Sequence, residues 1–313
     1  MRSLQLRFAI GFLLALGLAC CSTPKKVTLG PEPSTGAPLE TFGPPKPAET
    51  PLYGPTPELK KPVVLVFGPG LARGFAYVGV LRALHEARIP IAAILTTELG
   101  SLIGAMYATD ADINRFEWAL QGFKEEVFLE KGSLINRLLE KPSDGKKLSE
   151  ELEKVLGNKD LSGMKIPLQV GLQSESANEP TILNQGKVVA AIRAAMAVPG
   201  FLTVSDWNGT PAMAANSSRP YLVSEARALN LGPVIAVNVL STPDQSKSRV
   251  IEVQMKAAEN LGANDLRSAD LVLRPDMKGI GYLDFAKRND AAFRGKASVQ
   301  NRIGDIKKLL ESQ

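Results

Sequence analysis

Cysteine and histidine are scarce in this chain, which has two cysteines, Cys20 and Cys21, and one histidine, His85. Because no cysteine follows Cys21, the folded part can hold neither a disulfide nor a thiolate metal site. A Ser-His-Asp arrangement would have to use His85, which falls in the middle of a helical pattern and is expected on the surface of that helix. The sequence also lacks a Walker loop, a dinucleotide fingerprint and zinc-ligand spacing, so we expect no metal and no cofactor.

Excess positive charge is low as well. The net charge is +5, and removal of a leader that contains Arg2 and Arg7 would leave +3. No dense block of lysine and arginine with interleaved aromatic residues occurs. The composition therefore argues against nucleic acid as a partner.

Long apolar runs are missing at the N-terminus, where residues 8–19 form an apolar stretch of only 12 residues. This stretch is too short to cross a bilayer comfortably, so residues 1–19 are expected to form a signal peptide. It ends in Leu18-Ala19-Cys20-Cys21, which resembles a bacterial lipobox, where the cysteine becomes the acylated first residue. Ala19 favours lipidation of Cys20, with Cys21 as the alternative. A cleaved secretory signal with two incidental thiols is the simpler interpretation.

The cysteine pair is followed by a proline-rich segment, so residues 20–61 are expected to be a lipidated N-terminus and a linker. Residues 22–61 include 10 prolines and few large apolar side chains. Such a segment cannot bury enough surface to fold and could extend to about 100 Å, as a tether or as a proline-rich binding segment. No aspartate follows the cysteines, and by resemblance to Gram-negative lipoproteins this favours the outer membrane, facing the periplasm.

Residues 62–310 have the pattern of one α/β domain. Short, wholly apolar runs that are typical of buried strands alternate with helical patterns, which predicts a mostly parallel central sheet with helices on both faces. The charged, helical segment 113–156 is expected to cap the strand ends. Strands are expected at 63–67, 91–95, 166–172, 234–239 and 271–273, and helices at 73–87 and 98–108.

Several segments resemble the patatin-like phospholipase family, in the order in which that family has them. Together they cover residues 62–290, and the resemblance implies a three-layer patatin-like fold. It also implies acyl hydrolase chemistry by a Ser–Asp dyad, with the serine in a G-x-S-x-G elbow and a glycine-rich oxyanion loop. The matching segments are 64–81 at the opening, 91–108 at the elbow, 182–184 with 188–200 at the central helix, 223–239 after the aspartate and 269–281 near the end.

The family's catalytic positions are altered here. The elbow reads Thr96-Thr97-Glu98-Leu99-Gly100, so Glu98 stands at the nucleophile position. A carboxylate is electrostatically comfortable at a helix N-terminus and could fold into the vacated oxyanion site. The D-G-G of the family falls on Ala214-Ala215-Asn216, which puts Ala214 at the position of the base. Asp206 lies upstream, before an expected turn at Trp207-Asn208-Gly209, and is expected to be a hairpin residue.

The oxyanion loop is altered too, in Gly68-Pro69-Gly70-Leu71-Ala72-Arg73-Gly74. Pro69 has no N–H to donate, and Leu71 puts a side chain where the family often has glycine. Arg73 and Gly74 survive, and both suit a structural role: Arg73 can anchor the loop and Gly74 lets a helix pack closely.

Three altered positions predict a fold kept after catalysis was lost, serving as a lipid- or protein-binding module on the envelope membrane. An acyl hydrolase that uses displaced residues is the alternative, and a regulatory paralogue of an active relative is a third reading. Ser101, one turn into the elbow helix, is expected to pack and not to react. Pairing of Glu98 with Asp110 or Asp112 has no supporting spacing.

Overall fold

The computed structural model describes residues 61–129, 142–174, 180–243 and 248–311. The expected signal peptide, both cysteines and all of the linker before residue 61 lie outside the described residues. Within the described part, no helix is both long enough and apolar enough to cross a membrane.

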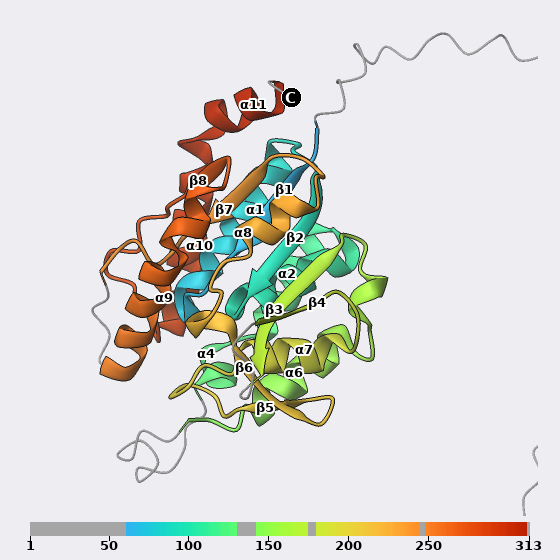
Figure 1. Cartoon of the computed structure of the whole chain (residues 1–313), viewed down its shortest axis with the longest axis vertical. Coiled ribbons are helices and arrows are strands. Elements are labelled where there is room, and N and C mark those ends of the chain that lie inside the picture. The colour runs from blue at the N-terminus through green and yellow to red at the C-terminus, as the bar shows by residue number, and fades with distance from the viewer. Residues whose placement is uncertain (1–60, 130–141, 175–179, 244–247, 312–313) are drawn as a thin grey trace, which may run out of the picture. The chain divides into compact units, whose positions relative to one another are not determined.

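One sheet forms the centre of the fold, with the strand order β5-β6-β3-β2-β1-β7-β8 and β4 paired to β3 (Figure 1). Its middle is parallel: β1 pairs with β2 and β7, β2 with β3, and β7 with β8. The mostly parallel sheet expected from the sequence is confirmed. These strands are β1 (Val63–Phe67), β2 (Ile91–Thr97), β3 (Leu168–Ser174), β7 (Val234–Val237) and β8 (Leu271–Leu273).

Three antiparallel strands extend the sheet beyond β3. Strands β5 (Ser205–Trp207) and β6 (Thr210–Ala214) form a hairpin, and β6 continues the pairing onto β3. Its turn uses Asn208 and Gly209 at φ 52° and 80°, so the turn expected there is confirmed. Strand β4 (Pro180–Leu183) was not predicted from the sequence.

Alternation along the central strand divides the core into two layers. Val63, Leu65 and Phe67 face the larger layer, whereas Val64 and Val66 face the smaller one, because successive side chains of a strand point to opposite faces. Helices therefore cover both faces of the sheet. The larger core includes α1 (Ala76–Glu86), α2 (Leu99–Asp110), α3 (Ile113–Ala119), α6 (Lys146–Leu156), α7 (Val188–Ala195), α10 (Arg288–Gln300) and α11 (Ile303–Glu311).

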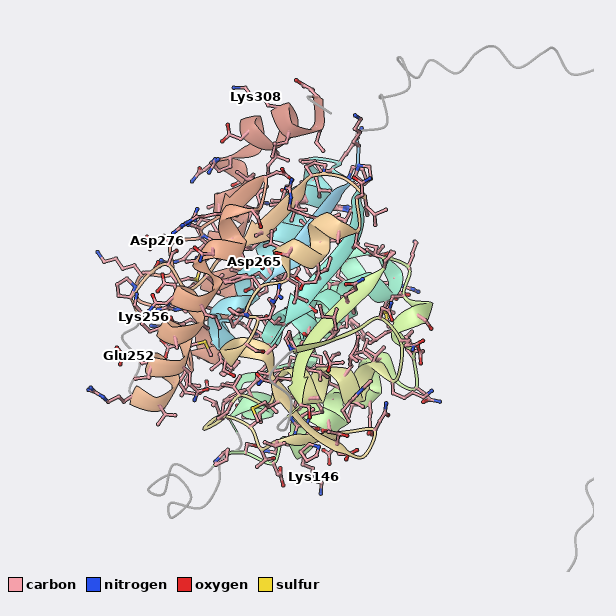
Figure 2. The ribbon with its side chains drawn as sticks, in the orientation of Figure 1. Lys146, Glu252, Lys256, Asp265, Asp276 and Lys308 are labelled. Atoms are coloured by element: carbon pink, nitrogen blue, oxygen red, sulfur yellow. The ribbon has the colours of Figure 1, made fainter. Side chains whose placement is uncertain are left out.

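The smaller layer is built from α8 (Val223–Ala228) and the C-terminal end of α9 (Arg249–Arg267). Asp265 of α9 accepts hydrogen bonds from the N–H groups of Val223 and Ser224, at 2.9 and 3.1 Å, and so caps the start of α8. Glu252 and Lys256 project from the outer side of α9 (Figure 2).

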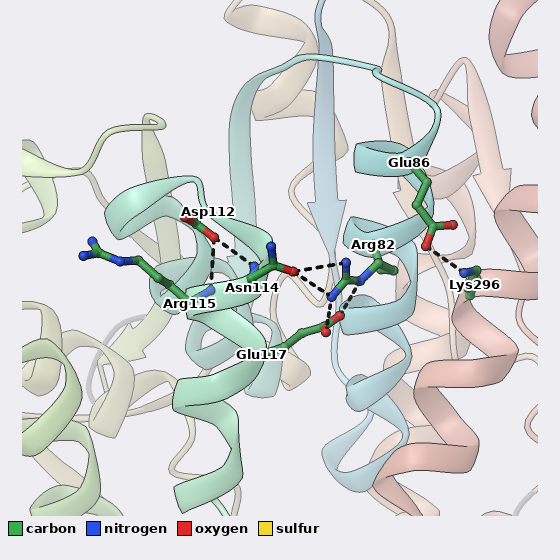
Figure 3. A network of polar contacts seen from close by, with 7 residues as sticks. All are labelled: Arg82, Glu86, Asp112, Asn114, Arg115, Glu117 and Lys296. Carbon is green, nitrogen blue, oxygen red and sulfur yellow. Dashed lines mark hydrogen bonds and ion pairs between the residues drawn. The ribbon is translucent and has the colours of Figure 1, made fainter.

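Helices α1 and α10 pack so closely that glycines of each helix lie against the backbone of the other. A Cβ on Gly79 would lie 1.7 Å from the Ala292 carbonyl oxygen, and one on Gly295 would lie 1.9 Å from that of Ala76. An ion pair at 2.8 Å between Glu86 and Lys296 joins the same two helices (Figure 3).

The predicted first helix differs at its start. It opens as a 3-10 turn, η1 (Leu71–Phe75), and becomes α-helical only at Ala76. The segment predicted as a helical cap contains α3, η2 (Leu120–Gly122), α4 (Glu125–Phe128) and α6, and part of it lies outside the described residues. The remaining 3-10 turns are η3 (Leu161–Gly163), η4 (Ala215–Ser217) and η5 (Phe285–Lys287).

Candidate functional site

Glu98 lies at a sharp turn between β2 and α2. Its backbone has φ 49° and ψ −129°, a conformation that costs a non-glycine residue about 1–3 kcal/mol. The turn is fixed on both sides. The Thr97 hydroxyl donates to the Pro220 carbonyl at 2.8 Å, and Gly100 packs so closely on Phe67 that a Cβ would lie 2.8 Å from the Phe67 Cβ.

The loop after β1 donates two backbone N–H groups to the Glu98 carboxylate. Gly70 N–H donates to Oε2 at 2.7 Å and Leu71 N–H to Oε1 at 2.8 Å, and the whole Glu98 residue is buried. Pro69, just before them, contributes no N–H. The carboxylate thus accepts two charge-assisted hydrogen bonds, which are stronger than hydrogen bonds between neutral groups. It does turn into the loop, as the sequence led us to expect.

Leu71 is the second strained residue of the site. It has φ 45°, in the left-handed region that favours glycine, and its side chain is fully buried. Its neighbour Ala72 donates its N–H to the Tyr282 carbonyl at 2.9 Å. Burial of the leucine and this bond hold the loop in the conformation that points two N–H groups at Glu98.

Arg73 and Tyr77 anchor the loop from the other side. The buried Arg73 guanidinium donates to the carbonyls of Ile280 and Thr242, both at 2.7 Å, and lies 4.2 Å from the centre of the Tyr282 ring. The Tyr77 hydroxyl donates to the Gly68 carbonyl at 2.8 Å. The sequence did not indicate this hydrogen bond, because no local residue pattern specifies it.

Gly74 permits the closest approach in this region. A Cβ at Gly74 would lie 2.9 Å from a Leu99 side-chain carbon, so η1 and the first turn of α2 are in direct contact. This is the close packing expected for Gly74 from the sequence.

Burial sets the electrostatics of the site. Loss of water raises the pKa of Glu98 to about 7, and the N–H groups of Gly70, Leu71 and Leu99 oppose that rise. The Asn216 amide also lowers this pKa, although neither of its polar atoms makes a hydrogen bond within 3.5 Å. Burial likewise raises the pKa of Tyr77 well above its usual value, with a smaller contribution from the Glu98 charge. Glu98 is therefore the group at this site that titrates near neutral pH.

The position expected for a base offers no carboxylate. Ala214, the last residue of β6, is buried and carries only a methyl group, and the 3-10 turn that follows brings Asn216 into the site. The Ser217 hydroxyl bonds Gln173, and that of Ser218 bonds the Ala215 carbonyl. Among the residues that the structure describes, none of these groups can accept a proton as a carboxylate would.

The other candidates lie away from Glu98 or are engaged elsewhere. His85 is exposed on the last turn of α1, as expected. Asp206 is exposed in the β5–β6 hairpin and accepts the Gly209 N–H at 3.1 Å. Asp112 caps α3, at the opposite end of α2 from Glu98, and Asp110 lies 3.6 Å from Arg115. Ser101 is buried one turn into α2, and its hydroxyl has no hydrogen-bond partner.

The arrangement holds the Glu98 carboxylate on two backbone donors. Within the described ranges, no hydroxyl or imidazole group hydrogen-bonds Glu98, and no group of three metal-ligating side chains is present. What remains is a pair of backbone donors suited to a negative oxygen, and the chain's own glutamate occupies both.

The sequence was compared with known families and proteins. A family described as patatin-like phospholipase matches residues 65–222, which is half of the chain. Lysophospholipase NTE1 of Phaeosphaeria nodorum is 29% identical over 210 residues, covering 64% of this chain and 14% of that protein. Lysophospholipase nte1 of Aspergillus fumigatus is 25% identical over 288 residues, covering 76% of this chain and 19% of that protein. The chain thus spans less than a fifth of either relative.

Two solved structures align with the chain at lower sequence identity. VipD from Legionella pneumophila aligns with a TM-score of 0.49 at 11% identity, over 81% of this chain and 67% of that one. The type III effector protein ExoU aligns with a TM-score of 0.38 at 11% identity, over 80% of this chain and 54% of that one.

Proposed function

The chain belongs to the patatin-like phospholipase family, and from that premise we propose that it is a non-catalytic member, a binding module held at a membrane by its N-terminus. The observation that carries this proposal is the contact of Glu98 with Gly70 and Leu71, at 2.7 and 2.8 Å. In the family this loop donates to the oxyanion of the reaction. Here a residue of the protein itself takes both donors, and it stands where the family has its serine.

The position of the base supports the same conclusion. Ala214 supplies no proton acceptor, and the neighbouring Asn216 is an amide. Loss of the nucleophile or the base from such a unit costs several orders of magnitude in rate, and both are replaced here. The loop is less damaged than Pro69 suggests, since two N–H groups remain in place.

The partner of such a module is a lipid or a protein of the envelope, and it binds outside the elbow. Glu98 is fully buried and fills its own hydrogen-bonding site, so the elbow offers no room for an acyl group. We propose attachment through lipidated Cys20, with Cys21 as the alternative, at the outer membrane and facing the periplasm. Residues 20–61 would then act as the tether.

A fluorophosphonate probe combined with an ester-hydrolysis assay tests the loss of catalysis. We expect neither labelling nor hydrolysis by the purified chain, since no described hydroxyl at the site is activated. Labelling of one serine that disappears when that serine is replaced would overturn the proposal.

An acyl hydrolase that uses a displaced serine is the second candidate. It is favoured by the lysophospholipase names of the relatives and by the unpartnered, buried hydroxyl of Ser101. The same assay on Ser101→Ala decides it. Hydrolysis by the parent chain that is lost in this variant would establish that the chain is an acyl hydrolase with Ser101 as its nucleophile.

A further inference from the structure

A cavity of about 820 Å³ opens between α3 and α6, over the C-terminal half of α2. Helix α2 has 12 residues and is about 18 Å long, so this groove lies at the other end of the helix from Glu98. It is separate from the site described above, and no residue of the β1 loop or the elbow lines it.

The base of this groove, which we call the Trp118 groove, is apolar. Met106, Phe116 and Leu156 are buried beneath it, and the half-buried Val155 forms part of its wall. Trp118 lies at its edge with 80% of its surface exposed, the largest exposed fraction among the big apolar side chains of the described residues. A tryptophan left this open beside an apolar hollow marks a place where a ligand gains contact area.

The charged groups around the groove are paired, with one exception. Arg115 lies 3.6 Å from Asp110, Lys154 bonds Glu151 at 2.9 Å, and Asp112 accepts the N–H groups that start α3. Lys159 lines the groove just beyond α6, and its ammonium group has no hydrogen bond or ion pair with any described residue. The groove therefore presents an apolar floor and, among three acidic and three basic side chains that balance in formal charge, one ammonium group without a described partner.

We propose that the Trp118 groove binds an anionic single-chain amphiphile, with its hydrocarbon chain along Met106, Phe116 and Val155 and its head group at Lys159. The volume lies within the roughly 300–1,000 Å³ of small-molecule sites, and the lining combines six apolar side chains with polar and charged ones. A docked protein would need about 800 Å² on each partner, more than a pocket of this kind offers.

This inference rests on the proposed function, because it names the class of ligand that the binding module would take. The groove lies outside the elbow, so hydrolysis by the chain would refute the loss of catalysis and leave the groove untouched. The two ideas therefore fail independently.

Trp118 itself can report the binding. The chain has 2 tryptophans, so Trp207→Phe leaves Trp118 as the sole emitter. The full chain would also carry Cys20→Ser and Cys21→Ser, to exclude a covalent acyl group. The probes are dodecanoate, dodecyl phosphate, the neutral dodecyl maltoside and inorganic phosphate, all below micelle-forming concentrations.

We expect both anionic chains to shift the Trp118 emission to shorter wavelength in a saturable manner, dodecyl maltoside to bind more weakly, and inorganic phosphate to give no response. Comparison of dodecanoate with dodecyl phosphate shows whether a carboxylate or a phosphate head is preferred. Equal binding of dodecyl maltoside would overturn the role of Lys159, and no shift with either anionic chain would overturn the groove.

Variants locate the site. Lys159→Gln should weaken dodecanoate binding up to about fivefold, the usual range for one exposed ion pair, and remove the preference over dodecyl maltoside. Val155→Glu puts a charge into the apolar wall and should weaken binding at least roughly tenfold. The matched control Val253→Glu changes an exposed valine of α9 outside the groove and should leave binding unchanged. Parental affinity in Val155→Glu would overturn the assignment.

Discussion

Glu98 gives the two backbone donors of the loop an acceptor within the same chain. Two backbone N–H groups aimed at one point need a negative oxygen, and leaving them buried without an acceptor costs about 1–3 kcal/mol each. The glutamate supplies two oxygens at once, at 2.7 and 2.8 Å. This gain explains how a residue with φ 49° is tolerated at the turn.

The raised pKa of Glu98 makes stability depend on pH. Its pKa is about 7 in the folded chain against 4.5 for an ordinary glutamate, so folding favours the protonated form. The stabilisation is fully present below a pH of about 4.5 and is lost as the pH rises through 7, up to about 3 kcal/mol in all. We expect the free energy of unfolding in urea to fall from about pH 5 to about pH 8, and to fall less in Glu98→Gln.

Glu126→Gln is the matched control for this experiment, because Glu126 is an exposed carboxylate on α4. Its pH dependence should equal that of the parent chain. A Glu98→Gln curve parallel to the parent curve would show that Glu98 does not titrate in this range.

Restoring the serine alone should not restore hydrolysis. Glu98→Ser frees the N–H groups of Gly70 and Leu71 but still has Ala214 in place of a base. We expect no ester hydrolysis above the Glu98→Ala background, and first activity only when Ala214→Asp is added. Activity in the single variant would show that the remaining groups suffice.

At the scale of single residues, the sequence predicted which residues stand at the site better than it predicted the contacts that they make. The family motif placed Glu98 and Ala214, and the chemistry of a carboxylate at a helix start predicted that it turns into the loop. The loss of the Pro69 N–H suggested a poorer loop than the one observed, because the motif does not show that Gly70 and Leu71 still point inward. The Tyr77 hydrogen bond to Gly68 joins α1 to the loop after β1, a contact that no residue pattern specifies.

At the scale of elements, helices α1 and α10 pack against each other at glycine residues. We expect Gly79→Ala to destabilise the chain by roughly 3 kcal/mol or more, because its Cβ would lie 1.7 Å from a backbone oxygen that cannot move aside. Thermal unfolding by circular dichroism measures the change. Gly304→Ala, on the exposed surface of α11 with no atom within 4 Å, should instead be neutral or stabilising by about 1 kcal/mol.

The sequence predicted strands well where an apolar run marks the strand. Four of the five parallel strands contain continuous apolar runs, whereas polar residues and a glycine interrupt the run of β3, and all five strands are present within a few residues of their expected bounds. Strand β4 begins with a proline and is only partly buried, so it has no such run. Its existence depends on pairing with β3, a tertiary contact that the sequence does not reveal.

At the scale of the whole molecule, the proposed lipid anchor at the N-terminus predicts where the protein is found. We expect a labelled fatty acid to be incorporated into the chain and the protein to sediment with membranes, and Cys20→Ser to abolish both, because the acyl chain is the proposed anchor. Cell fractionation with metabolic labelling measures this. Cys21→Ser is the control, and loss in that variant alone would move the acylation to Cys21.

The pairing of α1 with α10 also bears on when the fold can be completed. Glu86 and Lys296, which join these helices, are 210 residues apart in the chain. At a synthesis rate of about 5–20 residues per second, the first helix waits roughly 10–40 s for its partner. During that interval the nascent polypeptide lacks the α1–α10 contact, and on the proposed export of the chain this is the window in which an exporter that threads unfolded chains would engage it.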